Sequence, residues 1–339
     1  MQYSLSKFNF EQNHISDIKL GSMNFDFICI NKHTGKLMIF EYLKRGENQP
    51  DYITPLTSHI NLYIRQNKGK FESYKQAQEI LGADVYYINY AFENTPIKNK
   101  DNVTIDAGEL VKVMKQKSIV WGRNSTKKDF YTKEVKTVPG DMDFSVIGRF
   151  STFEQFGDWF YNFLSKNAMS IDAYVDPIEN DPHMISHEEA IAFLKDKNKE
   201  YQAQQDKSRA GISHRRRLIM PDLGGDILEN RLKFELNEFR LQVDKNFYLP
   251  TLNKYIFLNY IEVDGDPHAI NDPYPIVEPI YKKMGPLLPH FAVFVLYNSA
   301  SDNLTYVKIF NNKITTTKMS IEDFRTVMFS VSKLQYGGK

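Results

Sequence analysis

Apolar side chains form two short runs near the start of the chain, and a polar stretch that contains Gly35 separates them. The runs are residues 25–30, FDFICI, and residues 37–43, LMIFEYL. Runs of this length, rich in aromatic and branched residues and joined by a glycine-containing turn, predict two adjacent strands of a β-hairpin. Each predicted strand also carries one carboxylate, Asp26 in the first and Glu41 in the second.

The next segment, residues 61–82, predicts a helix, at least from Phe71 onward. Its apolar positions recur near helical spacing, and Gly82 is typical of a helix end. These positions are Phe71, Tyr74 and Ala77. Residues 83–91 then form a continuous apolar run, which predicts a strand inside a sheet. The order hairpin, helix, strand predicts a central mixed sheet with a crossover helix, which is an α/β core.

The chain after this core is rich in basic residues. Residues 103–116 predict a short strand that leads into a helix. Residues 112–136 hold many lysines and arginines with few apolar anchors, so we expect an exposed segment there. We place these elements in an N-terminal α/β domain that comprises residues 1–150.

The character of the chain changes at residue 151. Ser151 and Glu154 stand at capping-box spacing before a predicted helix whose phenylalanines share one face. These are Phe153, Phe156, Phe160 and Phe163. A polar helix is predicted from about Ser186. Ser320 and Asp323 predict the cap of a last helix.

Most of the remaining second half has the pattern of strands. The predicted strands are residues 232–243, 254–263, 290–297 and 303–310. Residues 151–339 therefore predict a strand-rich α+β domain, which we assign to specificity, nucleic-acid binding or assembly. We detect no internal repeat in the sequence.

Charge and cysteine content limit the classes of function. The chain has 43 lysines and arginines against 42 aspartates and glutamates, so it lacks an overall basic field for nucleic acid. Nucleic-acid contacts must come from local patches such as SHRRR at residues 213–217, for which a solvated charged loop is the alternative interpretation. The single cysteine, Cys29, excludes a disulfide framework and a cysteine-based zinc site.

Several common motifs are missing from the sequence. Neither G-x-x-x-x-G-K nor G-x-G-x-x-G occurs, and the histidines form no His-x-x-x-His pair, which disfavours nucleotide-dependent and zinc-dependent enzymes. The longest apolar run, residues 290–297, is too short to span a bilayer. We therefore expect a soluble, cytoplasmic protein without a membrane partner.

The two carboxylates of the predicted hairpin are the strongest chemical signal. Because side chains alternate along a strand, we expect Asp26 and Glu41 on the same side of the sheet, near one end. Two converging carboxylates repel each other unless a cation lies between them, and hard oxygen ligands suit Mg²⁺ or Mn²⁺. The alternative is that Asp26 ends its strand in solvent while Glu41 forms a surface ion pair with Lys44 or Arg45.

The first strand of the predicted hairpin carries an aspartate, and the second carries a glutamate with a lysine close behind. This pattern resembles the PD-(D/E)XK nuclease superfamily over residues 10–115. The resemblance implies a restriction-endonuclease-like fold. It also implies that Asp26 and Glu41 ligate Mg²⁺ or Mn²⁺, with the main-chain carbonyl of Tyr42 as a third ligand. Lys44 is then the catalytic lysine that places the attacking water.

The spacing Glu-Tyr-Leu-Lys is one residue longer than the Glu-x-Lys of the superfamily. In a regular strand this turns Lys44 to the opposite face, and a β-bulge restores it. Otherwise another basic residue substitutes for it. The candidates are Arg45, Lys70 and Lys75. By the same resemblance, Glu11 or Asp17 joins the site from before the first strand, and a polar helix residue faces it. The candidates for that residue are Lys75, Gln76 and Gln78.

These features predict a metal-dependent endodeoxyribonuclease, which hydrolyses phosphodiester bonds of DNA without a covalent enzyme intermediate. The basic residues expected to contact the nucleic acid are Arg45, Lys68, Lys70, Arg215, Arg216 and Arg217. One alternative is a non-catalytic nucleic-acid-binding or phage-type structural protein that retains a nuclease-like fold. Another is that residues 151–339 form a partner-binding module through which the chain assembles as a homo-oligomer.

Overall fold

The computed structural model describes most of the residues that carry predicted strands and helices. The described residues are 2–23, 25–44, 68–90, 97–98, 104–105, 111–128, 135–170, 184–186, 236–241, 243–284 and 290–336. The chain divides into two compact units, each built around its own sheet. The β3–β9 unit comprises Phe25–Ser170 and Phe239–Leu241, and the β11–β15 unit comprises Met1–Asn24, Ile171–Glu238 and Gln242–Lys339.

This division differs from the expected boundary at residue 150. The helix that follows residue 150 belongs to the β3–β9 unit, whereas the first 24 residues of the chain belong to the β11–β15 unit. Both units are therefore discontinuous in sequence. Long-range strand pairing and helix packing decide this division, and no shift in local composition marks it.

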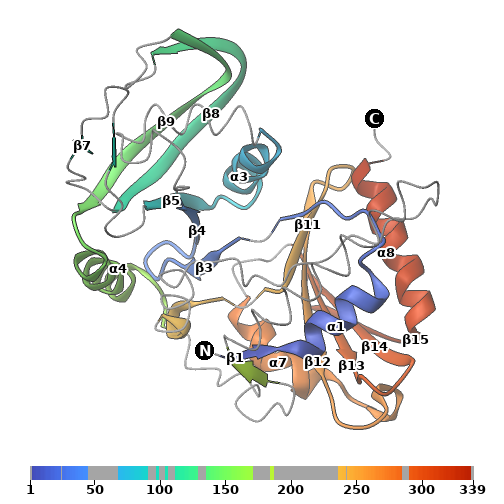
Figure 1. Ribbon diagram of the computed structural model, residues 1–339. Helices are drawn as coiled ribbons and strands as arrows, with labels where there is room; N and C mark the ends of the chain where they lie inside the picture. Colours follow the sequence, from blue (N-terminus) through green and yellow to red (C-terminus); the bar gives the residue numbers. More distant parts are fainter. Residues whose placement is uncertain are drawn as a thin grey trace. The chain divides into compact units, whose positions relative to one another are not determined.

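The β3–β9 unit is a five-stranded sheet with one helix in its crossover and one after its last strand (Figure 1). Its main elements are β3 (Phe27–Ile30), β4 (Leu37–Lys44), α3 (Lys68–Ile80), β5 (Asp84–Tyr90), β6 (Ile97–Lys98), β7 (Thr104–Ile105), β8 (Val111–Lys128), β9 (Val135–Phe150) and α4 (Phe153–Asn167). The strand order is β3-β4-β5-β8-β9, in which only β4 and β5 run parallel, and β6 pairs with β7 separately. The expected α/β class is confirmed.

Two glycines adopt the left-handed conformation where the sequence predicts a turn and a helix end. Gly35 has a φ of +67° in the β3–β4 hairpin, and Gly82 has a φ of +63° directly after α3. Glycine has no Cβ that clashes in this region. The hairpin is further held by Asn31, whose side-chain oxygen accepts the main-chain N–H groups of His33 and Thr34 at 2.9 and 3.0 Å.

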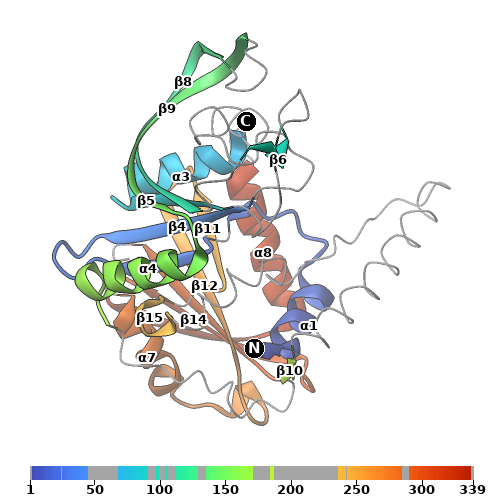
Figure 2. The same ribbon diagram turned by 60° about the vertical axis from the view of Figure 1, so that its left-hand side comes forward.

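Helices α3 and α4 pack against opposite faces of this sheet (Figure 2). Tyr74 of α3 lies against Tyr87 of β5, with ring centroids 5.7 Å apart. Phe160 of α4 lies against Phe40 of β4, with ring centroids 5.1 Å apart. Phe40 pairs with Tyr86, the neighbour of Tyr87, and successive residues of a strand point to opposite faces. Each face of the sheet is thus closed by one aromatic helix.

Helix α4 is confirmed, although a neighbouring residue caps it. Thr152 is the N-cap, and its hydroxyl oxygen accepts the N–H of Gln155 at 3.2 Å. Ser151 stands one residue earlier, and its main-chain N–H donates to the side chain of Gln155 at 3.2 Å. The cap and its return contact are therefore both shifted by one residue from the predicted Ser151 and Glu154 pair.

The helix expected within residues 103–116 is wrong where the structure describes it. The exposed segment expected over residues 112–136 is wrong for residues 112–116, which are buried or half-buried, but positions 117, 118, 120 and 122 are exposed. β8 and β9 form a long, curved hairpin (Figure 1). Val111, Val113 and Met114 are buried where β8 pairs with β5. Val111, Lys112 and Val113 have the period of a strand, and an irregularity in the pairing with β9 between Val113 and Met114 interrupts that period. The partner strand β5 is distant in sequence, so the local pattern alone did not reveal it.

The β11–β15 unit is a six-stranded sheet. Its main elements are α1 (Leu5–His14), β2 (Ser22–Met23), β11 (Lys245–Leu249), β12 (Lys254–Glu262), α7 (Tyr274–Lys283), β13 (Phe291–Tyr297), β14 (Asn303–Phe310), β15 (Lys313–Ser320) and α8 (Ile321–Tyr336). The strand order is β2-β11-β12-β13-β14-β15, in which only β12 and β13 run parallel. The other described elements are β1 (Gln2–Ser4), which pairs with β10 (Met184–Ser186), and the 3₁₀ helices η2 (Asn237–Phe239) and η3 (Pro267–Ala269).

Three strands predicted in the second half are confirmed as β12, β13 and β14. The cap of α8 is confirmed too, because the Ser320 hydroxyl oxygen accepts the N–H of Asp323 while the hydroxyl donates to the Asp323 carboxylate. The strand predicted at residues 232–243 is wrong in its described part, which contains η2. The helix predicted from Ser186 onward lies outside the described residues. Helices α1 and α7 and strand β15 were not predicted.

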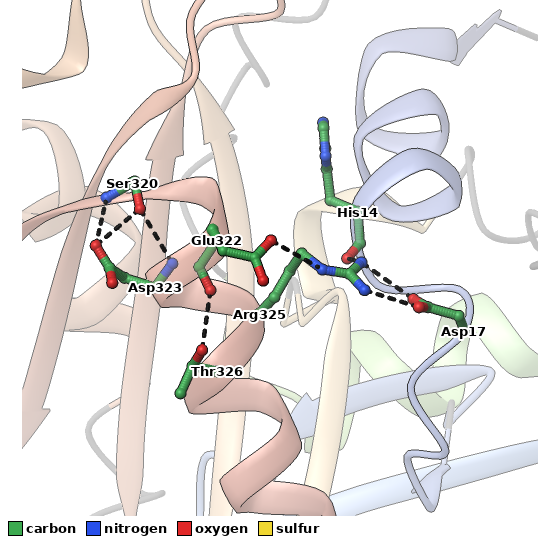
Figure 3. A network of polar contacts seen from close by, with 7 residues as sticks. All are labelled: His14, Asp17, Ser320, Glu322, Asp323, Arg325 and Thr326. Carbon is green, nitrogen blue, oxygen red and sulfur yellow. Dashed lines mark hydrogen bonds and ion pairs between the residues drawn. The ribbon is translucent and has the colours of Figure 1, made fainter.

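Arg325 of α8 ties the first residues of the chain to the β11–β15 unit (Figure 3). Its guanidinium donates to both carboxylate oxygens of Asp17, at 2.7 and 3.0 Å, and to the main-chain carbonyl of His14 at the end of α1. The ring centroid of Phe10 in α1 lies 6.2 Å from that of the buried Phe324. The charge-assisted, two-pronged contact and the apolar packing together explain why residues 1–24 belong to this unit.

Candidate metal centre on the β3–β4 hairpin

The β3–β4 hairpin places Asp26 and Glu41 side by side. Phe27 of β3 pairs with Phe40 of β4, so one step outward in the same register sets Asp26 opposite Glu41. Directly opposite residues on antiparallel strands share one face. That face is the one covered by α3, since Glu41 also pairs with Tyr87 on the neighbouring strand β5.

Asp26 stands just before β3 and is held by the neighbouring strand. Its carboxylate oxygen Oδ2 accepts the main-chain N–H of Tyr42 at 2.7 Å. A hydrogen bond to a charged acceptor is stronger than a neutral one. Asp26 thereby closes the open end of the hairpin and fixes its own carboxylate next to the β4 main chain.

Glu41 lies in the interior, with 1% of its side chain exposed. Two side chains of α3 contact its carboxylate. The Tyr74 hydroxyl donates to Oε2, and the Lys70 ammonium forms an ion pair with Oε1. A buried carboxylate is costly unless it is paired and hydrogen-bonded, and α3 supplies both compensations. The Lys70 side chain is 36% exposed, so it links the buried acid to solvent.

The electrostatics of the cluster follow from this burial. Burial raises the pKa of the Glu41 carboxyl, because the charged form loses its water, while Lys70, Tyr74 and Asp26 each act to lower that pKa. Burial and the negative charges of Glu41 and Asp26 raise the pKa of the Tyr74 hydroxyl well above its ordinary value. Tyr74 therefore stays protonated and acts as a hydrogen-bond donor to Glu41.

The donor set fits a hard divalent cation. Asp26 and Glu41 stand opposite each other on one face of the hairpin, and two carboxylates with waters and a main-chain carbonyl are ligands that Mg²⁺ takes readily. Glu41 and Asp26 would hold the ion together with the Tyr42 carbonyl. Within the described ranges, no group of three or more histidine, cysteine, aspartate or glutamate side chains is placed to hold a metal. The candidate centre thus has two acidic ligands.

The β-bulge that the sequence suggested is absent from β4. The pairing of β4 with β5 runs unbroken from Met38–Asp84 to Lys44–Tyr90. Position 44 is therefore out of phase with position 41 along the strand. The ammonium group that reaches Glu41 comes from Lys70 of α3, which is one of the substitutes that the sequence suggested for the motif lysine.

The other helix and N-terminal candidates have different partners. Lys75 pairs with Glu79 on the same helix at 2.8 Å, and the Lys68 ammonium lies 5.6 Å from the centre of the Trp121 ring. Glu11 and Asp17 both lie in the β11–β15 unit, where Glu11 pairs with Lys245 at 2.9 Å and Asp17 pairs with Arg325. The remaining basic candidates, Arg45, Arg215, Arg216 and Arg217, lie outside the described residues.

An amide and hydroxyl network beside the centre was only partly anticipated. The Tyr87 hydroxyl donates to Gln116 Oε1 at 2.5 Å, and Gln116 Nε2 donates to Gln78 Oε1 at 2.9 Å. The sequence suggested Gln78 among the polar helix residues, but Tyr74 and Tyr87 were interpreted only as apolar core positions. Their hydroxyl groups were the available signal, since a buried tyrosine hydroxyl usually needs a polar partner.

Comparison of the chain with protein-family models, with curated proteins and with solved structures finds no match. No described helix is long and apolar enough to cross a membrane. The function is therefore inferred from the geometry of the centre itself.

Proposed function

We propose that this protein is a metal-dependent nuclease that hydrolyses phosphodiester bonds of DNA. The observation that carries the proposal is the convergence of Asp26, Glu41 and Lys70 on one face of the β3–β9 sheet. Two carboxylates that can hold a metal ion, with an ammonium group beside them, are the groups that metal-assisted phosphoryl transfer uses. The hairpin, crossover helix and parallel strand that hold these groups also agree with the resemblance to the PD-(D/E)XK superfamily.

In this proposal each residue has a distinct task. Asp26, Glu41 and the Tyr42 carbonyl would hold Mg²⁺ or Mn²⁺, which would supply a water of lowered pKa and positive charge beside the phosphate. Tyr74 donates to Glu41 and keeps its carboxylate oriented. Lys70 pairs with Glu41 in the resting protein. With a side chain that is 36% exposed, Lys70 is the residue placed to contact a phosphate oxygen or an attacking water.

Cleavage of supercoiled plasmid in the presence of Mg²⁺ or Mn²⁺ tests the proposal. We expect Glu41→Gln and Lys70→Met to lose at least about 100-fold in cleavage rate, because each removes a group that acts on the reacting phosphate. Glu79→Gln, on the exposed side of the same helix, is the matched control and should retain full activity. Equal cleavage by wild type and Glu41→Gln, or no cleavage by wild type with either metal, overturns the proposal.

A second candidate is a non-catalytic DNA-binding or structural protein. The observation that favours it is that Glu41 is only 1% exposed and has both carboxylate oxygens in contact with α3. The cluster then serves to hold α3 on the sheet. Gel-shift measurements in EDTA separate the two candidates. DNA binding without metal, together with no Mn²⁺ affinity in calorimetry, supports the non-catalytic protein.

A further inference from the structure

The two units have the same arrangement of strands. In the β3–β9 unit the neighbouring pairs are antiparallel, parallel, antiparallel and antiparallel along β3-β4-β5-β8-β9. Along β11-β12-β13-β14-β15 the sequence of pair types is identical. The parallel pair contains a helix in each case, α3 in one and α7 in the other. A terminal helix follows the last strand in both, α4 and α8.

The helices also cover equivalent faces. Phe40 of β4 packs against α4. Its equivalent in β12, Leu258, belongs to the core cluster that contains Phe324 and Met328 of α8. On the opposite face, α3 covers Glu41. The end of α7 covers the equivalent position in β12, where the Asn259 side chain lies 3.9 Å from the sulfur of Met284.

The first hairpins of the two units match residue by residue. Asp26 precedes β3, and Asp244 precedes β11. Gly35 follows Asp26 by nine residues and Asn253 follows Asp244 by nine residues, and both are in the left-handed conformation, with φ values of +67° and +49°. The register is the same in both hairpins, because the pairs Phe27–Phe40 and Lys245–Leu258 lie at equal distances from Asp26 and Asp244. The loop between the paired strands has six residues in the first hairpin (31–36) and four in the second (250–253).

The aspartate makes the same hydrogen bond in both units. Asp244 Oδ2 accepts the main-chain N–H of Tyr260 at 2.7 Å, as Asp26 Oδ2 accepts that of Tyr42 at 2.7 Å. In each case donor and acceptor are 16 residues apart. The equivalence thus extends from strand order to a single side-chain contact.

The chemistry on the α3-covered and α7-covered faces differs. Opposite the aspartate, the first unit has Glu41 and the second has Asn259. The next residue across the sheet is Tyr87 in the first unit and Phe294 in the second. Asn259 is 1% exposed, and its side-chain oxygen accepts no hydrogen bond from any described residue. A buried carbonyl without a partner is costly, and it stands where the first unit has a carboxylate.

We infer that residues 244–336 are a second copy of the fold of residues 26–167, in which Asn259 in place of Glu41 leaves the two described sheets with one acidic pair and one divalent-cation site between them. The number of ions rests on the proposed function, whereas the duplication rests on the strand arrangement and the shared contact. The side chain at position 41 in the first copy, and at the equivalent position 259 in the second, decides whether that copy can bind a hard cation. The aspartate, with its hydrogen bond to the neighbouring strand, is common to both copies.

Titration with Mn²⁺, followed by the electron paramagnetic resonance signal of the free ion, tests the site count in the full chain. We expect one bound ion in wild type and none in Glu41→Gln. We expect two in Asn259→Glu, which creates a second pair of carboxylates with Asp244. One bound ion in a folded Asn259→Glu variant, or two in wild type, overturns the assignment of position 259. Asn259→Asp is the smaller substitution if Asn259→Glu does not fold.

Hydrogen exchange without metal tests the duplication independently. The amides of Tyr42 and Tyr260 should exchange about tenfold faster in Asp26→Ala and in Asp244→Ala, respectively, since each loses its acceptor. Faster exchange in only one of the two variants overturns the equivalence. Wild type that binds no Mn²⁺, with both exchange effects present, rejects the proposed function and keeps the duplication.

Discussion

The β3–β9 and β11–β15 units place different chemistry at the same position of the same strand arrangement. The first unit has Glu41 there, with Lys70 and Tyr74 in contact with its carboxylate. The second has Asn259, between Met284, which directly follows α7, and the apolar neighbour Phe294. The fold therefore does not require a charged cluster under the crossover helix.

This difference indicates what the charged cluster is for. Replacing a buried ion pair with apolar residues is often neutral or stabilising, so a buried pair is weak support for a stabilising role. The β11–β15 unit closes the same position with an amide, a thioether and a phenylalanine ring. The fold can omit this cluster, which is consistent with the chemical task that we propose for it.

The largest expected effect concerns the helices that close equivalent faces. Phe160→Ala in α4 and Phe324→Ala in α8 should each destabilise their own unit by about 3–5 kcal/mol, because each removes a fully buried ring. Both tryptophans, Trp121 and Trp159, lie in the β3–β9 unit. In urea unfolding, tryptophan fluorescence should then respond to Phe160→Ala, and far-ultraviolet circular dichroism should detect both variants.

The Phe324→Ala variant is the matched control for this comparison. Its fluorescence transition should stay at the wild-type urea concentration. If both variants shift the fluorescence transition equally, the two units unfold as one, and the comparison of separate folding units is wrong.

The next effect concerns the charged cluster. Lys70→Met should destabilise the β3–β9 unit by about 3 kcal/mol at pH 7, because it leaves Glu41 buried without its counter-charge. The loss should shrink as the pH falls, since burial already raises the pKa of Glu41 and the neutral acid can remain inside. Urea unfolding by tryptophan fluorescence at pH 5 and pH 7 measures it.

The double variant Glu41→Gln with Lys70→Met serves as the control for that experiment. It removes both charges and should regain most of the lost stability. A double variant as unstable as Lys70→Met alone contradicts a charge-based cause.

A smaller effect, confined to the β11–β15 unit, concerns His290. Burial and the nearby Lys254 lower the pKa of His290 to about 4, and its Nδ1 accepts the N–H of Tyr255 at 3.3 Å. The equivalent position before β5 is Ala83. Between about pH 6.5 and about pH 4, His290 is protonated in the unfolded chain but stays neutral in the folded chain. The free energy of unfolding therefore falls as the pH falls through this range, by at most about 3 kcal/mol.

Circular dichroism in urea at pH 7.5 and pH 5 measures this loss. His290→Gln should be less sensitive to pH than wild type over that interval, while the tryptophan signal of the β3–β9 unit should be the same in both proteins. An identical pH response in wild type and His290→Gln contradicts the assignment to His290.

The smallest effect tests the matched turns. Asn occupies the left-handed position in the second hairpin, so Gly35→Asn should change stability by less than about 0.5 kcal/mol. Gly35→Val should cost about 1–2 kcal/mol, because a branched residue is strained at φ +67°. A Cβ added at Gly35 would meet no other atom within 4 Å, so any loss of stability comes from backbone strain. Urea unfolding followed by tryptophan fluorescence measures that loss. Equal losses in both variants contradict the equivalence of the turns.

Local patterns predicted elements whose signals are short in range. The β3–β4 hairpin followed from two apolar runs and Gly35, and α3 followed from helical spacing and Gly82. The cap of α8 followed from Ser320 and Asp323. Each of these signals arises within a few residues, where turn geometry and side-chain periodicity act directly. The shared face of Asp26 and Glu41 also followed, since alternation and register leave little freedom.

Contacts between distant residues limited the prediction elsewhere. The strand at Val111–Met114 was interpreted as part of a helix because its partner β5 is separate in sequence. The repeat was not detected because the two copies share strand order and turn geometry but few residue identities. Pairing and packing accept many sequences of suitable hydrophobic pattern, so a fold can recur without a visible repeat.

The sequence by itself determined the hairpin, its turn, and the common face of its two acids, because those properties depend on alternation and on a glycine. Only the tertiary structure decided that Lys70 reaches Glu41, because helix packing brings its ammonium to the carboxylate, and that β4 continues without a bulge to position 44, because its pairing with β5 is unbroken. It also decided that residues 1–24 join the last helix, and that Asp244 and Asn259 occupy the positions of Asp26 and Glu41. These relations depend on which distant strands pair, and that choice is made by the whole core.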